Sequence, residues 1–174
     1  IATTPAPRIV FVRTHEHQAI LMKQLGNTAV HVNDKVPMND ANRAVRQLVN
    51  GTVGTLISTP IFRQGVDIPE IATVIQASGG KAVVDIIQKV GRGSRRHMKD
   101  GTTKDNFYVF DILDRGCGCR GSQQHKGCQW LEKHSQERKN AYERFGYVVR
   151  TERWILLPAS LLRVLVVARA RRQT

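Results

Sequence analysis

Two arginines in a glycine-rich segment, Arg92 and Arg95, are the side chains of this sequence best suited to chemistry. A guanidinium group is a planar fork of donors that fits phosphate oxygens. Gly91 and Gly93 let the backbone turn sharply and approach a ligand closely. Such a pair can stabilise charge on a phosphoryl group during its transfer. The alternative is a solvated basic loop that only touches nucleic acid.

A second segment, Thr59 to Pro69, directly follows a predicted strand. A hydroxyl at a strand end, such as that of Thr59, can bond a phosphate of a nucleic-acid backbone. Asp67, two residues after Gly65, can accept a ribose hydroxyl or orient a partner arginine. The alternative is a simple turn in which Asp67 caps the backbone and Pro69 ends the turn.

The elements that must position these segments alternate along the chain. Short β-branched and aromatic runs predict buried strands at 8–12, 29–32, 55–58, 73–77 and 106–113. Helices are predicted at 14–25, 40–50 and 83–90, the second with Asn39 as N-cap and Gly51 at its end. This order predicts an α/β fold with a mainly parallel sheet flanked by helices. The chemistry of such folds lies beyond the carboxyl ends of the strands, where both segments fall.

The composition favours a polyanionic partner. The 174 residues include 27 Lys and Arg against 14 Asp and Glu, a net charge of +13, and 41% are apolar, enough for a core. Nucleic acid is the first expectation, an anionic membrane the second, and a basic but inert surface the alternative. Three cysteines and no long apolar run favour a reducing intracellular setting without a membrane span. The first residue is Ile1 rather than Met, which indicates a fragment of a longer protein.

Together the two segments resemble motifs V and VI of superfamily 2 helicases. The motif V pattern, Thr, five residues, Gly, one residue and Asp, matches Thr59, Gly65 and Asp67. The motif VI pattern matches Gln88, Lys89, Gly91, Arg92 and Arg95, with Lys89 where many relatives have Arg. The strand and helix over 8–25 resemble motif IV, and the helix ending at Gly51, with its outward Arg43, resembles the one before motif V.

The resemblance implies the C-terminal, RecA-like motor domain of an ATP-dependent helicase or translocase. Arg92 and Arg95 would reach the γ-phosphate and Gln88 would couple the site. Gly65 and Asp67 would link the nucleotide to the track strand, and Thr14, Thr59 and Arg43 would contact nucleic acid. ATP and Mg²⁺ would be held mainly by an N-terminal RecA-like domain of the same protein. This chain has neither a phosphate-binding loop nor an Asp-Glu pair, so it is expected to be inactive alone.

The closing region narrows the resemblance. Segments 133–138 and 142–147 resemble the closing helix of phage-type members, which include branch-migration and recombination helicases. This favours DNA over RNA as the track, and a cytoplasmic location, in the host cytoplasm if the protein is viral. The rival functions are a non-catalytic nucleic-acid-binding module and a nucleotide-dependent enzyme that uses the Gly-x-Gly-x-x-Gly of residues 116–121.

The expected domain organisation has three parts: a linker over 1–7, the motor domain over 8–150 and a basic amphipathic C-terminal tail over 151–174. The tail is expected to form a short helix that packs on its own domain or a neighbour, or lies on a membrane or on nucleic acid. Cys117, Cys119, His125 and Cys128 are a possible zinc set, but a Gly-rich loop is the default because Cys-x-Cys is tighter than the usual spacing.

Overall fold

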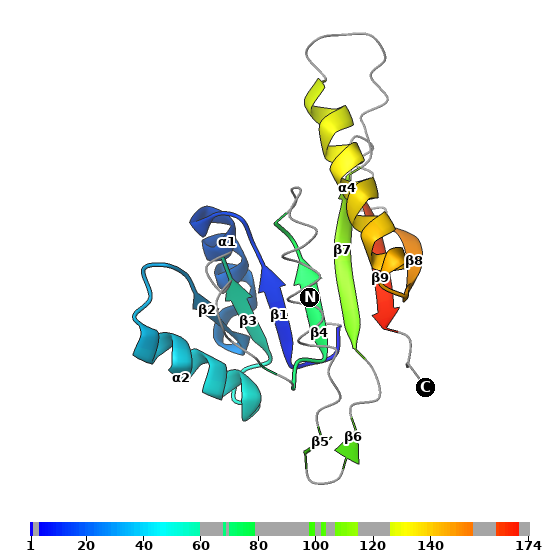
Figure 1. Cartoon of the computed structure of the whole chain (residues 1–174). Helices are drawn as coiled ribbons and strands as arrows, with labels where there is room; N and C mark the ends of the chain where they lie inside the picture. Colours follow the sequence, from blue (N-terminus) through cyan, green and yellow to red (C-terminus); the bar gives the residue numbers. More distant parts are fainter. Residues whose placement is uncertain are drawn as a thin grey trace.

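The fold is seen in a computed structural model, which describes residues 1, 4–59, 68, 70–78, 98–99, 102–103, 107–114, 126–154 and 163–170. Its centre is a seven-stranded sheet with the order β2-β3-β1-β4-β7-β9-β8 (Figure 1). The strands are β1 (Arg8–Phe11), β2 (Ala29–Val32), β3 (Thr55–Ser58), β4 (Thr73–Gln76), β7 (Tyr108–Asp114), β8 (Tyr147–Trp154) and β9 (Arg163–Ala170). The helices are α1 (His15–Leu25), the 3₁₀ turn η1 (Gly26–Thr28), α2 (Met38–Val49) and α4 (Lys126–Arg144). In a separate two-stranded sheet, β5 (Met98–Lys99) pairs antiparallel with β6 (Thr102–Thr103).

Five neighbouring strands, β2, β3, β1, β4 and β7, are parallel. One continuous row of register partners crosses them near their carboxyl ends: Val32, Ser58, Phe11, Gln76 and Asp111. The carboxyl ends therefore meet at one edge of the sheet, and the predicted α/β class with a mainly parallel sheet is confirmed.

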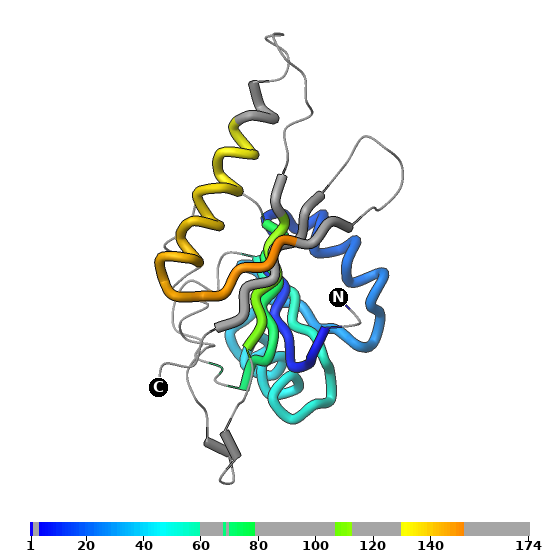
Figure 2. The backbone as a smooth tube through the Cα atoms, turned by 90° about the vertical axis from the view of Figure 1, so that its right-hand side faces the viewer, coloured from blue at the N-terminus to red at the C-terminus, as the bar shows by residue number. Residues whose placement is uncertain are grey.

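Helices cover both faces of the sheet because buried strand residues alternate between them. One face forms a core with α2 and α4 that includes Phe11, Leu56, Val74, Val109, Ala44, Leu48 and Tyr142. The other face forms a core with α1 that includes Val10, Ile57, Ile75, Leu21, Met22 and Leu25. Figure 2 shows α1 (blue) and α4 (yellow) on opposite sides of the sheet.

The helix α2 follows its predicted apolar spacing but starts earlier than expected. Ala41, Ala44 and Leu48 are its buried residues, as the periodicity indicates. The N-cap is Pro37, with no side-chain cap bond, so the prediction of Asn39 as N-cap is wrong. A proline is tolerated there because the first amides of a helix have no partner within it. The helix gives way to Gly51, whose φ of +78° is the conformation that favours glycine.

The C-terminal region corrects the predicted helical tail. Strand β8 crosses the predicted boundary at residue 150, and β9 pairs antiparallel with both β7 and β8. Segment 163–170 is thus a strand of the domain's own sheet, not an amphipathic helix. Its valines, Val164, Val166 and Val167, are β-branched and prefer strands, and pairing satisfies the backbone groups along the edge of β7.

The predicted linker is also attached to the domain. The Thr73 hydroxyl donates to the Pro5 carbonyl over 2.7 Å, and the Ala72 amide donates to the Pro7 carbonyl over 2.8 Å. These bonds hold residues 5–7 against the start of β4, so this part of the lead-in is not a free connection.

A buried ion pair anchors α4 to β7. Arg138 and Asp111, each 1% exposed, are joined by bonds of 2.8 Å from Nε to Oδ2 and 3.2 Å from Nη2 to Oδ1. Nη2 of Arg138 also donates to the Ile112 carbonyl, and the Tyr142 hydroxyl donates to Oδ2 of Asp111 over 3.1 Å. Burial raises the pKa of Asp111 even though the Arg138 charge opposes the shift. Burial and the carboxylate raise the pKa of Tyr142 well above its usual value, so its phenol stays protonated and can donate.

Candidate nucleic-acid interface

Two of the predicted nucleic-acid contacts, Thr14 and Thr59, lie at the carboxyl edge of the sheet. Thr14 follows β1 and Thr59 follows β3, and these strands are direct neighbours. The Val12 amide donates to the Ser58 carbonyl over 2.9 Å, which continues the pairing past the end of β1. The Thr59 amide donates to the Val32 carbonyl over 3.3 Å, which ties the same edge to β2. The structure thus places both threonines at one edge.

Thr14 is the N-cap of α1. Its backbone is extended, and its Oγ1 accepts a 3.2 Å hydrogen bond from the His17 amide. A threonine hydroxyl has one donor hydrogen besides its acceptor sites, so this cap leaves the O–H able to donate to a phosphate. The first-turn amides and the dipole of α1 favour an anion at the same point.

Thr59 differs from Thr14 because its side chain is buried. It is 4% exposed, and within the described part of the chain its Oγ1 has no hydrogen-bond partner. An unpaired buried hydroxyl costs about 1–3 kcal/mol. A contact from Thr59 to nucleic acid therefore requires its side chain to become accessible, and a partner there would recover that cost.

A neutral amide network fixes the edge where these threonines lie. The Gln18 side chain, 3% exposed, donates through Nε2 to the carbonyls of Val32 (3.1 Å) and Ile57 (3.0 Å). Its Oε1 accepts from Nδ2 of Asn33 over 2.7 Å. Gln18 thereby joins α1 to the ends of β2 and β3. Sequence reasoning missed it, although Gln18 lies on the same helix stripe as Leu21, Met22 and Leu25, which marks it as buried.

Further polar groups line the same edge. Gln76, at the end of β4, is 3% exposed and donates through Nε2 to the Ser78 hydroxyl, while its Oε1 has no partner among the described residues. His15 and Asp34, after β1 and β2, are paired over 2.7 Å and about half exposed. The edge therefore offers donors and acceptors from four successive strands, a composition suited to a polar polymer rather than to an apolar ligand.

The third predicted contact, Arg43, is on α2 rather than at this edge. Its side chain is 69% exposed and pairs with Asp40 over 3.2 Å, one helical turn away. An exposed pair of this kind contributes about 0–1 kcal/mol, so it does not prevent Arg43 from contacting a phosphate.

The remaining predicted site residues lie outside the described residues. These are Gly65, Asp67, Gln88, Arg92 and Arg95, together with the glycine-rich segment 116–121 and the side chains of the possible zinc set. Within the described ranges, no group of three or more metal-binding side chains occurs. No helix in those ranges is long and apolar enough to cross a membrane.

The chain matches one known protein family over most of the parallel sheet. Residues 3–97 match the family described as the helicase conserved C-terminal domain, which is more than half of the chain. The chain belongs to this family. The predicted resemblance to the C-terminal, RecA-like domain of superfamily 2 helicases is thereby confirmed.

Similar proteins include RNA and DNA helicases. The pre-mRNA-splicing ATP-dependent RNA helicase prp28 of Schizosaccharomyces pombe is 32% identical over 99 residues, or 55% of this chain and 15% of that protein. The ATP-dependent DNA helicase fml1 of the same organism is 29% identical over 92 residues, or 53% of this chain and 10% of that protein. The chain thus spans only a small part of these helicases' length.

A solved structure shares the fold. The C-terminal domain of Saccharomyces cerevisiae Dbp5, in a complex with Gle1 and IP6, aligns with a TM-score of 0.54 at 18% identity. The alignment covers 83% of this chain and 72% of that chain. This likeness supports the RecA-like architecture of the helicase C-terminal domain.

Proposed function

We propose that this chain is the second motor domain of an ATP-dependent superfamily 2 helicase or translocase. The observation that carries the proposal is the placement of Thr14 and Thr59 at one polar edge of a helicase C-terminal domain. In this proposal the edge follows the phosphates of a single strand. Thr14 donates from the N-terminus of α1, Thr59 contributes its unpaired hydroxyl, and Arg43 adds charge from α2.

The nucleotide side of the proposal rests on the sequence. Arg92 and Arg95 donate to the γ-phosphate when the two motor domains close, Gln88 couples the site, and Gly65 and Asp67 link it to the strand. ATP with Mg²⁺, held mainly by the first motor domain, supplies the phosphoryl group whose transfer drives the cycle. We also propose that the protein acts in the cytoplasm.

The bound strand in this proposal is DNA rather than RNA. Phosphate contacts do not distinguish DNA from RNA, and the similar proteins include both an RNA and a DNA helicase. The closing region of the sequence favours DNA. Matched oligonucleotides with deoxyribose and ribose, titrated against the same chain, test this preference directly.

We expect the chain to bind single strands in a salt-dependent manner. The net charge of +13 supplies the attraction, and counterion release makes the affinity fall as salt rises. Thr14→Ala and Thr59→Val should each weaken binding several-fold, because each removes a hydroxyl donor to the phosphates. Fluorescence anisotropy of a labelled oligonucleotide at several salt concentrations measures both effects.

Thr28→Ala is the matched control. Thr28 is an exposed threonine at the amino edge of the sheet, and its hydroxyl makes one local bond to the Leu25 carbonyl. Thr14→Ser keeps the helix cap and should bind as the unmodified chain does. An affinity that is flat across the salt series, or equal losses in the Thr28 and Thr14 variants, would contradict the proposed interface.

A further inference from the structure

An exposed tryptophan on α4 has one side of its ring held in place. Trp130 is 53% exposed, and its ring centroid lies 3.7 Å from that of His134, with the planes tilted by 57°. His134 is only 2% exposed. The imidazole is therefore fixed by its surroundings and supports the indole, while about half of the Trp130 surface stays open to solvent.

Hydrogen bonds further along α4 anchor the helix that carries Trp130. One helical turn beyond His134, the Arg138 side chain binds Asp111 of β7 through two bonds and the Ile112 carbonyl through a third. Arg138 also donates to the hydroxyl of buried Ser135 over 3.3 Å. A side chain fixed before binding loses little conformational entropy when a ligand arrives.

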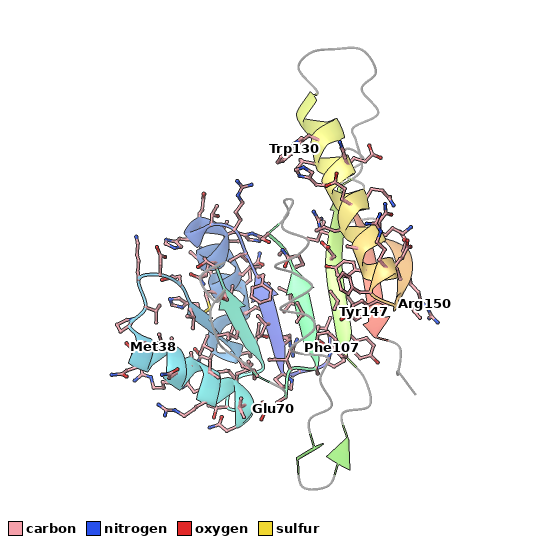
Figure 3. The ribbon with its side chains drawn as sticks, viewed as in Figure 1. Met38, Glu70, Phe107, Trp130, Tyr147 and Arg150 are labelled. Carbon is pink, nitrogen blue, oxygen red and sulfur yellow. The ribbon has the colours of Figure 1, made fainter. Side chains whose placement is uncertain are left out.

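Trp130 lies on the part of α4 that extends beyond the carboxyl edge of the sheet. Figures 1 and 2 both show the N-terminal half of α4 extending past the carboxyl ends of the parallel strands. Figure 3 labels Trp130 on this half of the helix, and in that view its side chain points away from α4 toward the side on which β1, β3 and β4 lie. Thr14 and Thr59 follow β1 and β3, two of these strands.

The described residues one helical turn beyond Trp130 are polar. One helical turn on, the same face carries exposed Lys133 and then His134. Leu131 is also exposed, at 38%, but its own neighbours one turn on are His134 and Ser135. The apolar surface is thus not continued along the described part of the helix, as it would be for an apolar protein partner.

We propose that Trp130, supported by His134, is a stacking platform for an unpaired nucleobase of the strand bound at the carboxyl edge. Every base has a π-face, so the contact suits a motor that must accept any sequence, and Lys133 supplies charge for the adjoining phosphate. The inference rests on the proposed function, because it concerns the same bound strand. The stacking contact adds binding of a base to an edge that is otherwise proposed to bind only phosphates.

The test uses the intrinsic fluorescence of the chain. Of the two tryptophans, Trp154 is changed to Phe so that Trp130 is the single reporter. Titration with oligothymidylate should quench the emission, whereas an abasic oligonucleotide of equal length should bind through its phosphates without quenching. In a separate anisotropy assay, Trp130→Ala should weaken oligothymidylate binding roughly tenfold, within the range for one stacked base. It should leave abasic binding and the salt dependence unchanged.

Phe145→Ala is the matched control, since Phe145 is an exposed aromatic (61%) just beyond the other end of α4. It should bind both oligonucleotides as the unmodified chain does, and Trp130→Phe should keep most of the affinity. If the chain binds no oligonucleotide, the proposed function fails and this inference fails with it. If it binds, but Trp130→Ala binds normally and no quenching occurs, only the platform is overturned. The stacking platform is likewise overturned if Trp130→Ala impairs only the assembly with another protein domain and leaves oligonucleotide binding unchanged.

Discussion

The two halves of the sheet bury polar side chains in different ways. Where β2 and β3 end, neutral Gln18 and Asn33 tie the strands to α1. On β7, charged Asp111 and Arg138 tie the strand to α4. An amide buried with its bonds satisfied carries a small desolvation cost, whereas a buried ion requires its partner to stay in place. The attachment of α4 is therefore the more sensitive of the two to the loss of a single partner, and this helix carries the proposed stacking side chain beyond the sheet.

The largest effect on folding is expected at the ion pair. Arg138→Met leaves the Asp111 carboxylate buried without its cation, which should lower the free energy of unfolding by about 3–5 kcal/mol. Urea denaturation followed by circular dichroism measures the loss. Asp111→Leu combined with Arg138→Met should recover much of it, because an apolar pair of similar size leaves no unpaired charge. A loss below about 1 kcal/mol for Arg138→Met would show that the pair does not anchor α4 in this way.

A smaller effect is expected at the neutral network. Gln18→Leu keeps the helix stripe apolar but removes the donor to the Val32 and Ile57 carbonyls, at a cost of about 1–3 kcal/mol. Gln24→Ala, an exposed glutamine on the same helix, is the control and should change stability by less than about 0.5 kcal/mol. The same urea titration applies. A Gln18→Leu loss as large as that of Arg138→Met would erase the contrast between the two halves.

Much of the parallel core could be predicted because its signals are local. The β-branched runs located β2 and β3 at their observed bounds, and the spacing of Ala41, Ala44 and Leu48 identified the buried face of α2. Because Thr14 and Thr59 follow the predicted strands at 8–12 and 55–58, the sequence also predicted that both lie at the carboxyl edge of the sheet. These features depend on short-range periodicity, which a single sequence displays.

The C-terminal region could not be predicted in the same way. Segment 163–170 alternates weakly and carries arginines at both ends, so a helix fitted it as well as a strand. Its conformation is decided by pairing with β7, whose partner residues lie 49 (Asp114 to Arg163) to 61 (Tyr108 to Arg169) positions earlier in the chain. Likewise, the sequence around Arg138 predicts an exposed side chain, because its partner Asp111 is distant in the chain and contacts it only in the folded domain. The roles of Arg92 and Arg95 remain predictions from the family pattern.

The central claim is that this domain completes a motor, and the arginines test it most directly. In a protein that joins this domain to a first motor domain, ATP turnover is measured at saturating nucleic acid and saturating ATP. The chain alone should show no turnover. Arg92→Lys and Arg95→Lys should each reduce turnover by roughly 10³ or more, because lysine cannot reproduce the planar fork. Recovery to near the unmodified rate at saturation would show that the arginines only hold nucleic acid and would contradict the account.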